Sequence, residues 1–135
     1  MLKPLIISLL VYSFGLTAQE TKEQLHNIYF GGGSWYIDNE QANELKELVN
    51  SIKNLDYYEI SITSHTDNIG GKEFNAYLSR MRSESVMRLL RKIGVNPESM
   101  KYEDYGEDNP IFDNSTMMGK LKNRRVDILF TPIQF

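Results

Sequence analysis

The chain has 135 residues, of which 15 are basic and 18 acidic, and it contains no cysteine. Its formal net charge of −3 argues against a partner that presents a phosphate backbone, so we expect no nucleic acid. Without cysteine we expect no disulfide, no thiolate metal site and no lipid anchor at a cleavage-site cysteine. The core alone must therefore stabilise the fold, which is feasible for one domain of this size.

The first nineteen residues differ from the rest, because Lys3 is their only charged residue. The largely apolar run from Leu5 to Leu16 is too short to cross a bilayer, which takes roughly 20 residues. A positive start, a short apolar segment and a small residue at Ala18 are typical of a secretory signal peptide. We expect residues 1–18 to be that signal, with a retained anchor as the alternative. Loss of Lys3 would change the net charge from −3 to −4.

The next part of the chain predicts a strand followed by a helix. Residues 19–27 are polar, and we expect a loose lead-in there. A short strand is expected from His26 to Phe30, before three glycines. Apolar residues then recur at helical spacing, which predicts a helix capped by Asp38 or Asn39 and closed near Asn54.

The remaining sequence predicts three strands and a second helix. Apolar and polar side chains alternate over residues 57–63 and again over 125–130, and we expect another strand over residues 100–106. A long helix is expected from about Phe74 to Ile93, ended by Gly94. Between the last two strands we expect mostly loop with one helical turn. This order predicts an α+β fold, a mixed sheet with two main helices packed on one face.

Arg82 stands in the apolar stripe of the long helix. At roughly 100° per residue it falls between Leu89 and Ile93. An arginine on a core-facing stripe must be paired or must reach water. Two interpretations remain open. Either the side chain snorkels, with its guanidinium in water, or it lines a site at the end of the sheet and faces Asp67.

The stretch TSHTDNIGG, residues 63–71, follows the strand at a place where such sheets commonly bind ligands. Asp67 favours an ammonium and Arg82 fits a carboxylate, so together they would receive an amino-acid head group. Metal binding has little support, because His26 and His65 are the only histidines and no thiolate is present. No hydrolase or phosphate-binding motif appears, and we expect His65 to be structural.

Two stretches, HTDNIGGKEFNAYLSRMRSESVMRLLRKIG and YGEDNPIFDNSTMMGKLKNRRVDI, resemble the signature of the OmpA-like C-terminal domain, which binds peptidoglycan. The matching positions are Thr66, Asp67, Gly70, Asn75, Leu78, Ser79, Arg82, Gly106, Pro110, Asn114, Thr116, Gly119, Asn123, Arg124, Arg125 and Val126. The resemblance implies the family's βαβαβ-β sandwich over residues 28–131. It also implies a protein that is not an enzyme and needs no cofactor.

The resemblance further implies a ligand and its contacts. In that family, the aspartate and arginine that match Asp67 and Arg82 hold the amine and carboxylate of a diaminopimelate residue in the peptide stem. The residues that match Asn75 and Arg124 lie near the ligand. The segment FGGGSWYI replaces the family's Asp- or Asn-bearing turn, so we expect the backbone of Gly33 to contact the ligand instead.

The implied location is the periplasm, where the domain would bind peptidoglycan and anchor an envelope protein or complex to the cell wall. The alternative is a scaffold subunit of an outer-membrane secretion or gliding complex that has lost peptidoglycan binding. Trp35 and Tyr36 would then face a partner, although we expect one of them to lie in the core. Asn123 and Arg124 precede the last strand and are expected to reach the rim of the same site.

Overall fold

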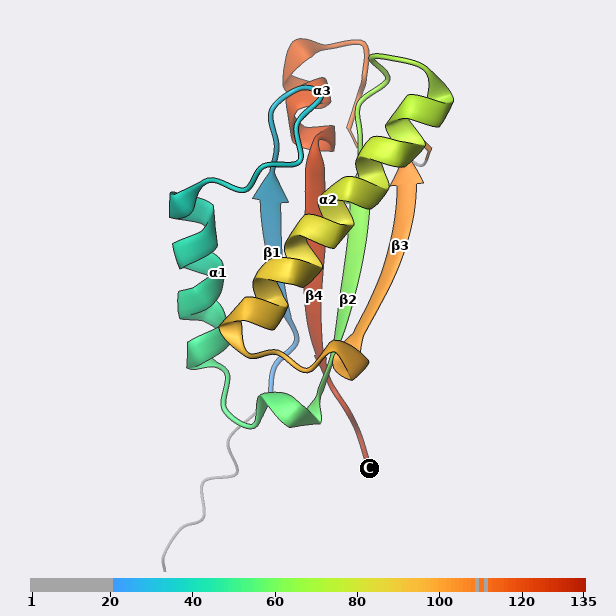
Figure 1. Ribbon diagram of the computed structural model, residues 1–135. Helices are drawn as coiled ribbons and strands as arrows, with labels where there is room; N and C mark the ends of the chain where they lie inside the picture. Colours follow the sequence, from blue (N-terminus) through green and yellow to red (C-terminus); the bar gives the residue numbers. More distant parts are fainter. Residues whose placement is uncertain (1–20, 109, 111) are drawn as a thin grey trace, which may run out of the picture.

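A computed structural model describes residues 21–135 except 109 and 111 (Figure 1). The expected signal peptide, residues 1–18, lies outside the described residues. The strands are β1 (Gln24–Tyr29), β2 (Tyr58–His65), β3 (Met100–Gly106) and β4 (Arg125–Pro132), and the helices are α1 (Asn39–Ser51), α2 (Lys72–Ile93) and α3 (Met117–Asn123), with short 3-10 turns at Leu55–Tyr57 and Pro97–Ser99.

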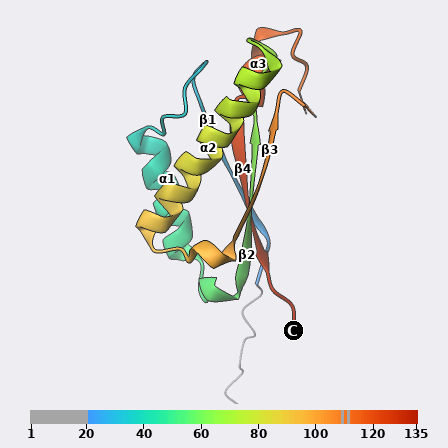
Figure 2. The same ribbon diagram turned by 45° about the vertical axis from the view of Figure 1, so that its right-hand side comes forward.

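The four strands form one mixed sheet in the order β1-β4-β2-β3. β2 and β3 run parallel, whereas β4 is antiparallel to both of its neighbours. The helices α1 and α2 cover the same face of this sheet (Figure 2). The predicted α+β fold, with two main helices on one face of a mixed sheet, is confirmed.

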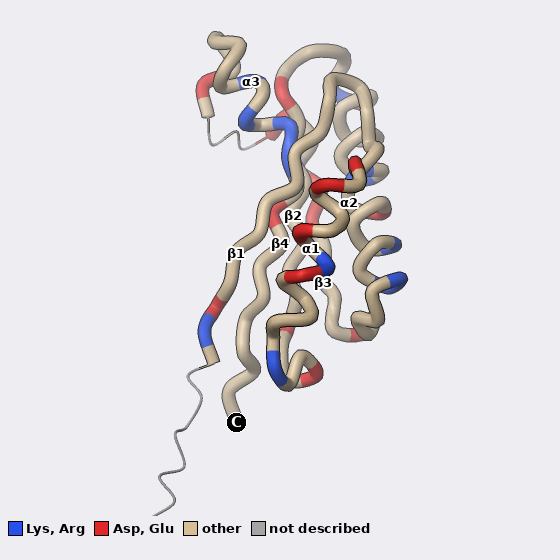
Figure 3. Tube along the Cα trace, turned by 90° about the vertical axis from the view of Figure 1, so that its left-hand side faces the viewer, with Lys and Arg blue, Asp and Glu red and all other residues tan. Residues whose placement is uncertain are grey.

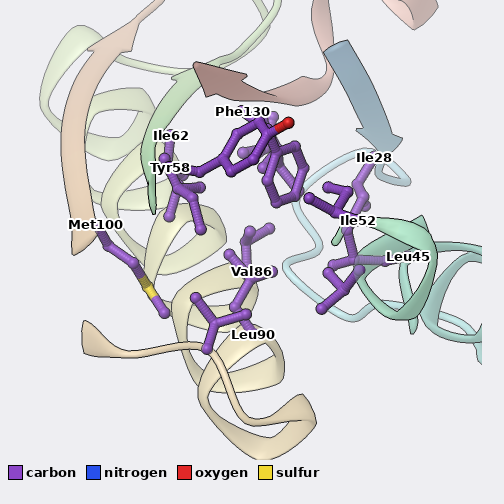
Figure 4. Close-up of a cluster of buried hydrophobic side chains, with 14 of the residues drawn as sticks. Ile28, Leu45, Ile52, Tyr58, Ile62, Val86, Leu90, Met100 and Phe130 are labelled. Atoms are coloured by element: carbon purple, nitrogen blue, oxygen red, sulfur yellow. The ribbon is translucent and has the colours of Figure 1, made fainter. Parts of the chain in front are cut away.

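The hydrophobic core lies between the sheet and the two long helices (Figure 4). Alternation along β4 points Val126, Ile128 and Phe130 at the helices, and all three are fully buried. Val86 and Leu90 of α2 pack against them in the same cluster. Each such side chain contributes about 1.5–3 kcal/mol when it leaves water, so this layer holds the elements in place without a disulfide.

Several element boundaries differ from the sequence-based expectation, and three of them are informative. β1 begins at Gln24, because it pairs with β4 along its whole length, and residues 24–27 therefore belong to the sheet. α1 ends at Ser51, and Asn54 adopts a left-handed conformation with φ 57° that starts the next turn. α2 begins at Lys72, two residues earlier than expected.

Most charged residues of the long helix α2 lie on the side away from the sheet (Figure 3), whereas Arg82 is buried. Arg80, Arg88, Arg91 and Lys92 are exposed, whereas Leu78, Val86 and Leu90 face the sheet. Among the residues the structure describes, no helix is both long enough and apolar enough to cross a membrane.

The direction of the strands gathers four segments at one end of the sheet. β1, β2 and β3 all end there, and β4 begins there, because β4 is antiparallel to its neighbours. The segments 30–38 and 66–71 and the described residues of 107–116, together with α3, therefore lie near one another at the upper end of Figure 1. This is the end at which the sequence places Asp67.

Gly119 lets α3 pack against the segment before it. Where one helical turn was expected, α3 is a helix over Met117–Asn123 whose first turn is capped by Thr116, with Oγ1 accepting from the Gly119 N–H at 3.0 Å. A Cβ at Gly119 would overlap the main-chain carbonyl of Asp113.

We expect Gly119→Ala to lower the free energy of unfolding by about 1–3 kcal/mol, as overpacking of a close contact typically does. Urea denaturation followed by circular dichroism would measure it. Met118→Ala is the matched control, because this neighbouring side chain is 63% exposed. It should change stability by less than about 0.5 kcal/mol. Equal stability of the two variants would contradict the close packing of α3.

Candidate ligand-binding site

Asp67 is held at the rim of the sheet by two hydrogen bonds. Asp67 is 5% exposed and lies two residues after the end of β2. One oxygen accepts from Nε of Arg124 at 2.5 Å, and the other accepts from the Ile69 N–H at 3.0 Å. Arg124 directly precedes β4, the neighbour of β2, so the sheet brings the two residues together.

Arg82 is fully buried and binds main-chain carbonyls. Nε donates to the carbonyl of Ser34 at 2.8 Å, Nη1 to that of His65 at 3.2 Å and Nη2 to that of Gly31 at 3.0 Å. The guanidinium also lies 5.1 Å from the ring centre of Phe30. Because the side chain does not reach solvent, the snorkelling interpretation is wrong. Arg82 instead ties the glycine segment to the end of β2.

Asp67 and Arg82 border the same pocket without a direct ion pair between them. The pocket has a volume of about 180 Å³, and Arg124 lines it as well. Burial lowers the pKa of Arg82 to about 10; the charge of Asp67 acts in the opposite direction, and that of Arg124 lowers the value further. The ion-pair partner of Asp67 is Arg124, which the sequence placed near the site without assigning this pairing.

The other walls of the pocket are glycine backbone and apolar side chains. Gly33 lines it with φ at +66°, a conformation that side-chain-bearing residues rarely adopt. Ile69, Phe74 and Leu78 form the apolar wall, which the sequence analysis missed. The spacing of Phe74 and Leu78, four residues apart on one helix face, was the signal available for part of it.

Asn75 is buried behind the pocket and does not line it. Its Nδ2 donates to the main-chain oxygen of Asp67 at 3.3 Å and to the carboxylate of Glu107 at 3.0 Å. Its Oδ1 accepts no hydrogen bond from the described residues and lies beside Gly70. Asn75 therefore positions the loop that carries Asp67, with Glu107 as a partner that the sequence did not reveal.

Asn123 does not reach the pocket, and that expectation is wrong. The side chain is fully buried and holds the segment before α3. Its Oδ1 accepts from the Phe112 N–H at 3.1 Å, while Nδ2 donates to the carbonyl of Phe112 at 2.8 Å and to Oδ1 of Asn114 at 2.7 Å. Asn123 thus fixes the segment that leads into Arg124.

A second charged cluster lies on the opposite face of the sheet. Arg125 donates to both carboxylate oxygens of Asp127, at 2.9 and 3.2 Å, and Nε2 of His65 lies 3.5 Å from the same carboxylate. Burial alone would raise the pKa of Asp127, but the hydrogen bonds and charges of His65 and Arg125 outweigh it and lower the pKa. Across the described part of the chain, no group of three or more metal-ligating side chains is present.

Trp35 and Tyr36 both face solvent, 38% and 70% exposed, so the expectation that one of them lies in the core is wrong. The next residue, Ile37, packs against the core instead. The Tyr36 N–H donates to Oγ of Ser34 at 3.1 Å, which turns the segment so that the two aromatic rings stay outside.

The fold and this pocket define a small α+β domain with a charged cleft at the rim of a mixed, helix-covered sheet. Residues 29–124 match the model of the OmpA family, and the chain belongs to that family. The resemblance inferred from the sequence is confirmed. Domains of this family are not enzymes, which agrees with the prediction.

Curated relatives include the probable lipoprotein YiaD of Escherichia coli (strain K12), which is 32% identical over 108 residues. That match covers 80% of this chain and 49% of the relative. The outer-membrane lipoprotein YfiB of Pseudomonas aeruginosa is 29% identical over 102 residues, covering 76% of this chain and 61% of the relative. The chain thus spans about half the length of the first of these relatives and three fifths of the second.

Solved structures show the same fold. The peptidoglycan-associated lipoprotein from Burkholderia pseudomallei superposes with a TM-score of 0.72 at 26% identity, covering 78% of this chain and 89% of that one. The C-terminal domain of Helicobacter pylori MotB superposes with a TM-score of 0.68 at 24% identity, covering 78% and 84%. The MotB likeness bears on the fold alone.

Proposed function

We propose that this domain binds the peptide stem of peptidoglycan non-covalently in the periplasm, and so anchors an envelope protein or complex to the cell wall. The observation that carries the proposal is the convergence of Asp67, Arg82 and Arg124 on one small pocket. Membership of the OmpA family supports it, as does the structural likeness to a peptidoglycan-associated lipoprotein at 26% identity.

The charges of the pocket fit a ligand that carries both an ammonium and a carboxylate. Asp67 accepts one hydrogen bond on each oxygen from the protein, and each oxygen has a further lone pair for an ammonium. On Arg82, three N–H groups are used by carbonyls and the side chain is fully buried, so its positive charge attracts a carboxylate from the wall of the pocket. A diaminopimelate side chain ends in this pair of groups.

The ion pair between Asp67 and Arg124 holds both side chains in position at the pocket in the absence of a ligand. The pocket is lined by one carboxylate and two guanidiniums. Its net positive charge therefore favours a ligand that brings at least one carboxylate. The terminal nitrogens of Arg124 lie close to Gly32, on the glycine side of the pocket. They can therefore donate to the ligand while Nε keeps Asp67 in place.

Gly33 and Asn75 complete the proposed contacts in different ways. Gly33 lines the pocket, and its backbone is the group it offers to the ligand. Asn75 holds the main-chain oxygen of Asp67, and its free Oδ1 lies beside Gly70 at the pocket wall. We assign Asn75 to positioning Asp67 and not to direct contact with the ligand.

The test compares two synthetic stem peptides by isothermal titration calorimetry. One contains diaminopimelate; the other contains lysine, which keeps the ammonium and lacks the terminal carboxylate. We expect the diaminopimelate peptide to bind at least about 10-fold more tightly, because the lysine peptide leaves the guanidinium donors unpaired. Equal affinity for the two peptides would refute recognition of the zwitterion.

A further inference from the structure

Both walls of the pocket continue outward into an exposed aromatic side chain. The glycine segment that contributes Gly33 leads two residues later to Trp35, and α2, which contributes Phe74 and Leu78, also carries Tyr77. Trp35 and Tyr77 are 38% and 42% exposed. Their ring centres lie 6.2 Å apart and their planes meet at 88°, an edge-to-face pair.

The aromatic pair is held in position by its neighbours. The guanidinium of Arg80 lies 5.6 Å from the centre of the Tyr77 ring, which braces that ring from its own helix. On the other side, the carbonyl of Ser34, next to Trp35, accepts a hydrogen bond from buried Arg82. Trp35 is therefore an exposed ring on an anchored segment.

Beyond Trp35 the surface opens into a groove between α1 and α2. The groove has a volume of about 470 Å³, and its lining includes Trp35, Tyr36, Leu89, Arg88 and Lys92. None of the described residues that line the groove is acidic, although the chain as a whole has a net negative charge. Gly33 lines the pocket and Trp35 lines the groove. The pocket and the groove therefore follow one another along the same segment of the chain.

We propose that Trp35 and this groove form a saccharide subsite, which receives the sugar chain of the polymer whose peptide stem enters the Asp67 pocket. The inference rests on the proposed function and adds a second contact region to it. A pocket of about 180 Å³ accommodates one terminal group of a stem, so the rest of the polymer must lie on the surface outside. Pyranose rings present an apolar C–H face that packs on aromatic rings, and exposed aromatic surface commonly marks a binding site.

The charge of the groove agrees with this ligand. The peptide carboxylates of such a polymer are anionic, and Arg88 and Lys92 provide cations beside the aromatic rings. A neutral sugar ring over Trp35 and a carboxylate near Arg88 would together occupy the groove without burying an unpaired charge.

The experiment uses a free stem tetrapeptide and the same tetrapeptide attached to its N-acetylated disaccharide, titrated into the full chain by calorimetry. We expect the disaccharide form to bind about 3- to 10-fold more tightly, the range typical of one aromatic contact. Trp35→Ala should remove this difference and leave the affinity for the free peptide unchanged. Trp35 is the only tryptophan, so its fluorescence should respond more to the disaccharide form.

The matched control is Tyr57→Ala. Tyr57 is 56% exposed and forms an edge-to-face pair with Phe135, 5.8 Å apart, at the opposite end of the sheet. This variant should keep the full difference between the two ligands. Equal wild-type affinity for both, or a difference that persists in Trp35→Ala, would overturn the subsite and assign the aromatic surface to a protein partner. If neither ligand binds the wild type, the proposed function fails and the subsite with it.

Discussion

Arg82→Met should lower the free energy of unfolding by about 3–5 kcal/mol, the largest change we expect from any single substitution in this domain. The variant removes the donors to three main-chain carbonyls, those of Gly31, Ser34 and His65. Arg82 is fully buried, so water cannot readily replace the lost bonds. Methionine keeps much of the side-chain volume, which limits the contribution of a cavity.

Urea denaturation would measure this loss, with Arg91→Met as the matched control. Arg91 is on the same helix but exposed, so its replacement should change stability by less than about 0.5 kcal/mol. Similar stability of the two variants would show that the carbonyl contacts of Arg82 contribute little. Because Arg82 has this structural role, a loss of binding in its variants says nothing about ligand contact unless the variant is folded.

The fold was largely predictable because its main signals are local. Alternation over residues 58–63 and 125–130 marks the two central strands, and Gly94 ends α2 in a left-handed conformation with φ 109°. The first strand was harder to place. Its residues Gln24 to Asn27 are mostly polar, and only pairing with β4 makes them a strand.

The site was predictable in part. Helical periodicity indicated Arg82, because an arginine in an apolar stripe must be paired or must reach water. The position of Asp67 just after a strand indicated that residue. The partners of Arg82 were not predictable, since main-chain carbonyls leave no signature in the sequence. The pairing of Asp67 with Arg124 depends on β2 and β4 being neighbours, which is a property of the topology.

Two errors have the same physical origin. Trp35 and Tyr36 were expected to divide between core and surface, and Asn123 was expected at the rim. In each case the local path of the main chain determined which side chain points into the core and which does not reach the expected place. Ile37 occupies the core position next to the aromatic residues, and Asn123 is used by the main chain of Phe112.

Asp67→Asn should weaken binding of a diaminopimelate stem peptide by about 2–5 kcal/mol, or roughly 30-fold and more. The substitution keeps the shape of the side chain and an oxygen that can accept from the Ile69 N–H. It removes the negative charge that the proposed ammonium requires. The ligand's ammonium would then lie near two guanidiniums, Arg82 and Arg124, with no carboxylate of the pocket to pair with it.

Asp127→Asn provides the matched control. Asp127 is also paired with an arginine at the same end of the sheet, but β4 directs it to the opposite face. Its replacement removes an equal charge and a comparable ion pair, and it should leave the affinity for the stem peptide unchanged. Melting temperatures of both variants would establish that each is folded under the conditions of the titration.

The most direct test of the account is calorimetric titration of the diaminopimelate stem peptide into the wild type, Asp67→Asn and Asp127→Asn. We expect one binding site in the wild type, the same affinity in Asp127→Asn, and a loss of roughly 30-fold or more in folded Asp67→Asn. Absence of binding to the wild type, or equal binding by folded Asp67→Asn, would contradict the claim that this pocket holds the peptide stem.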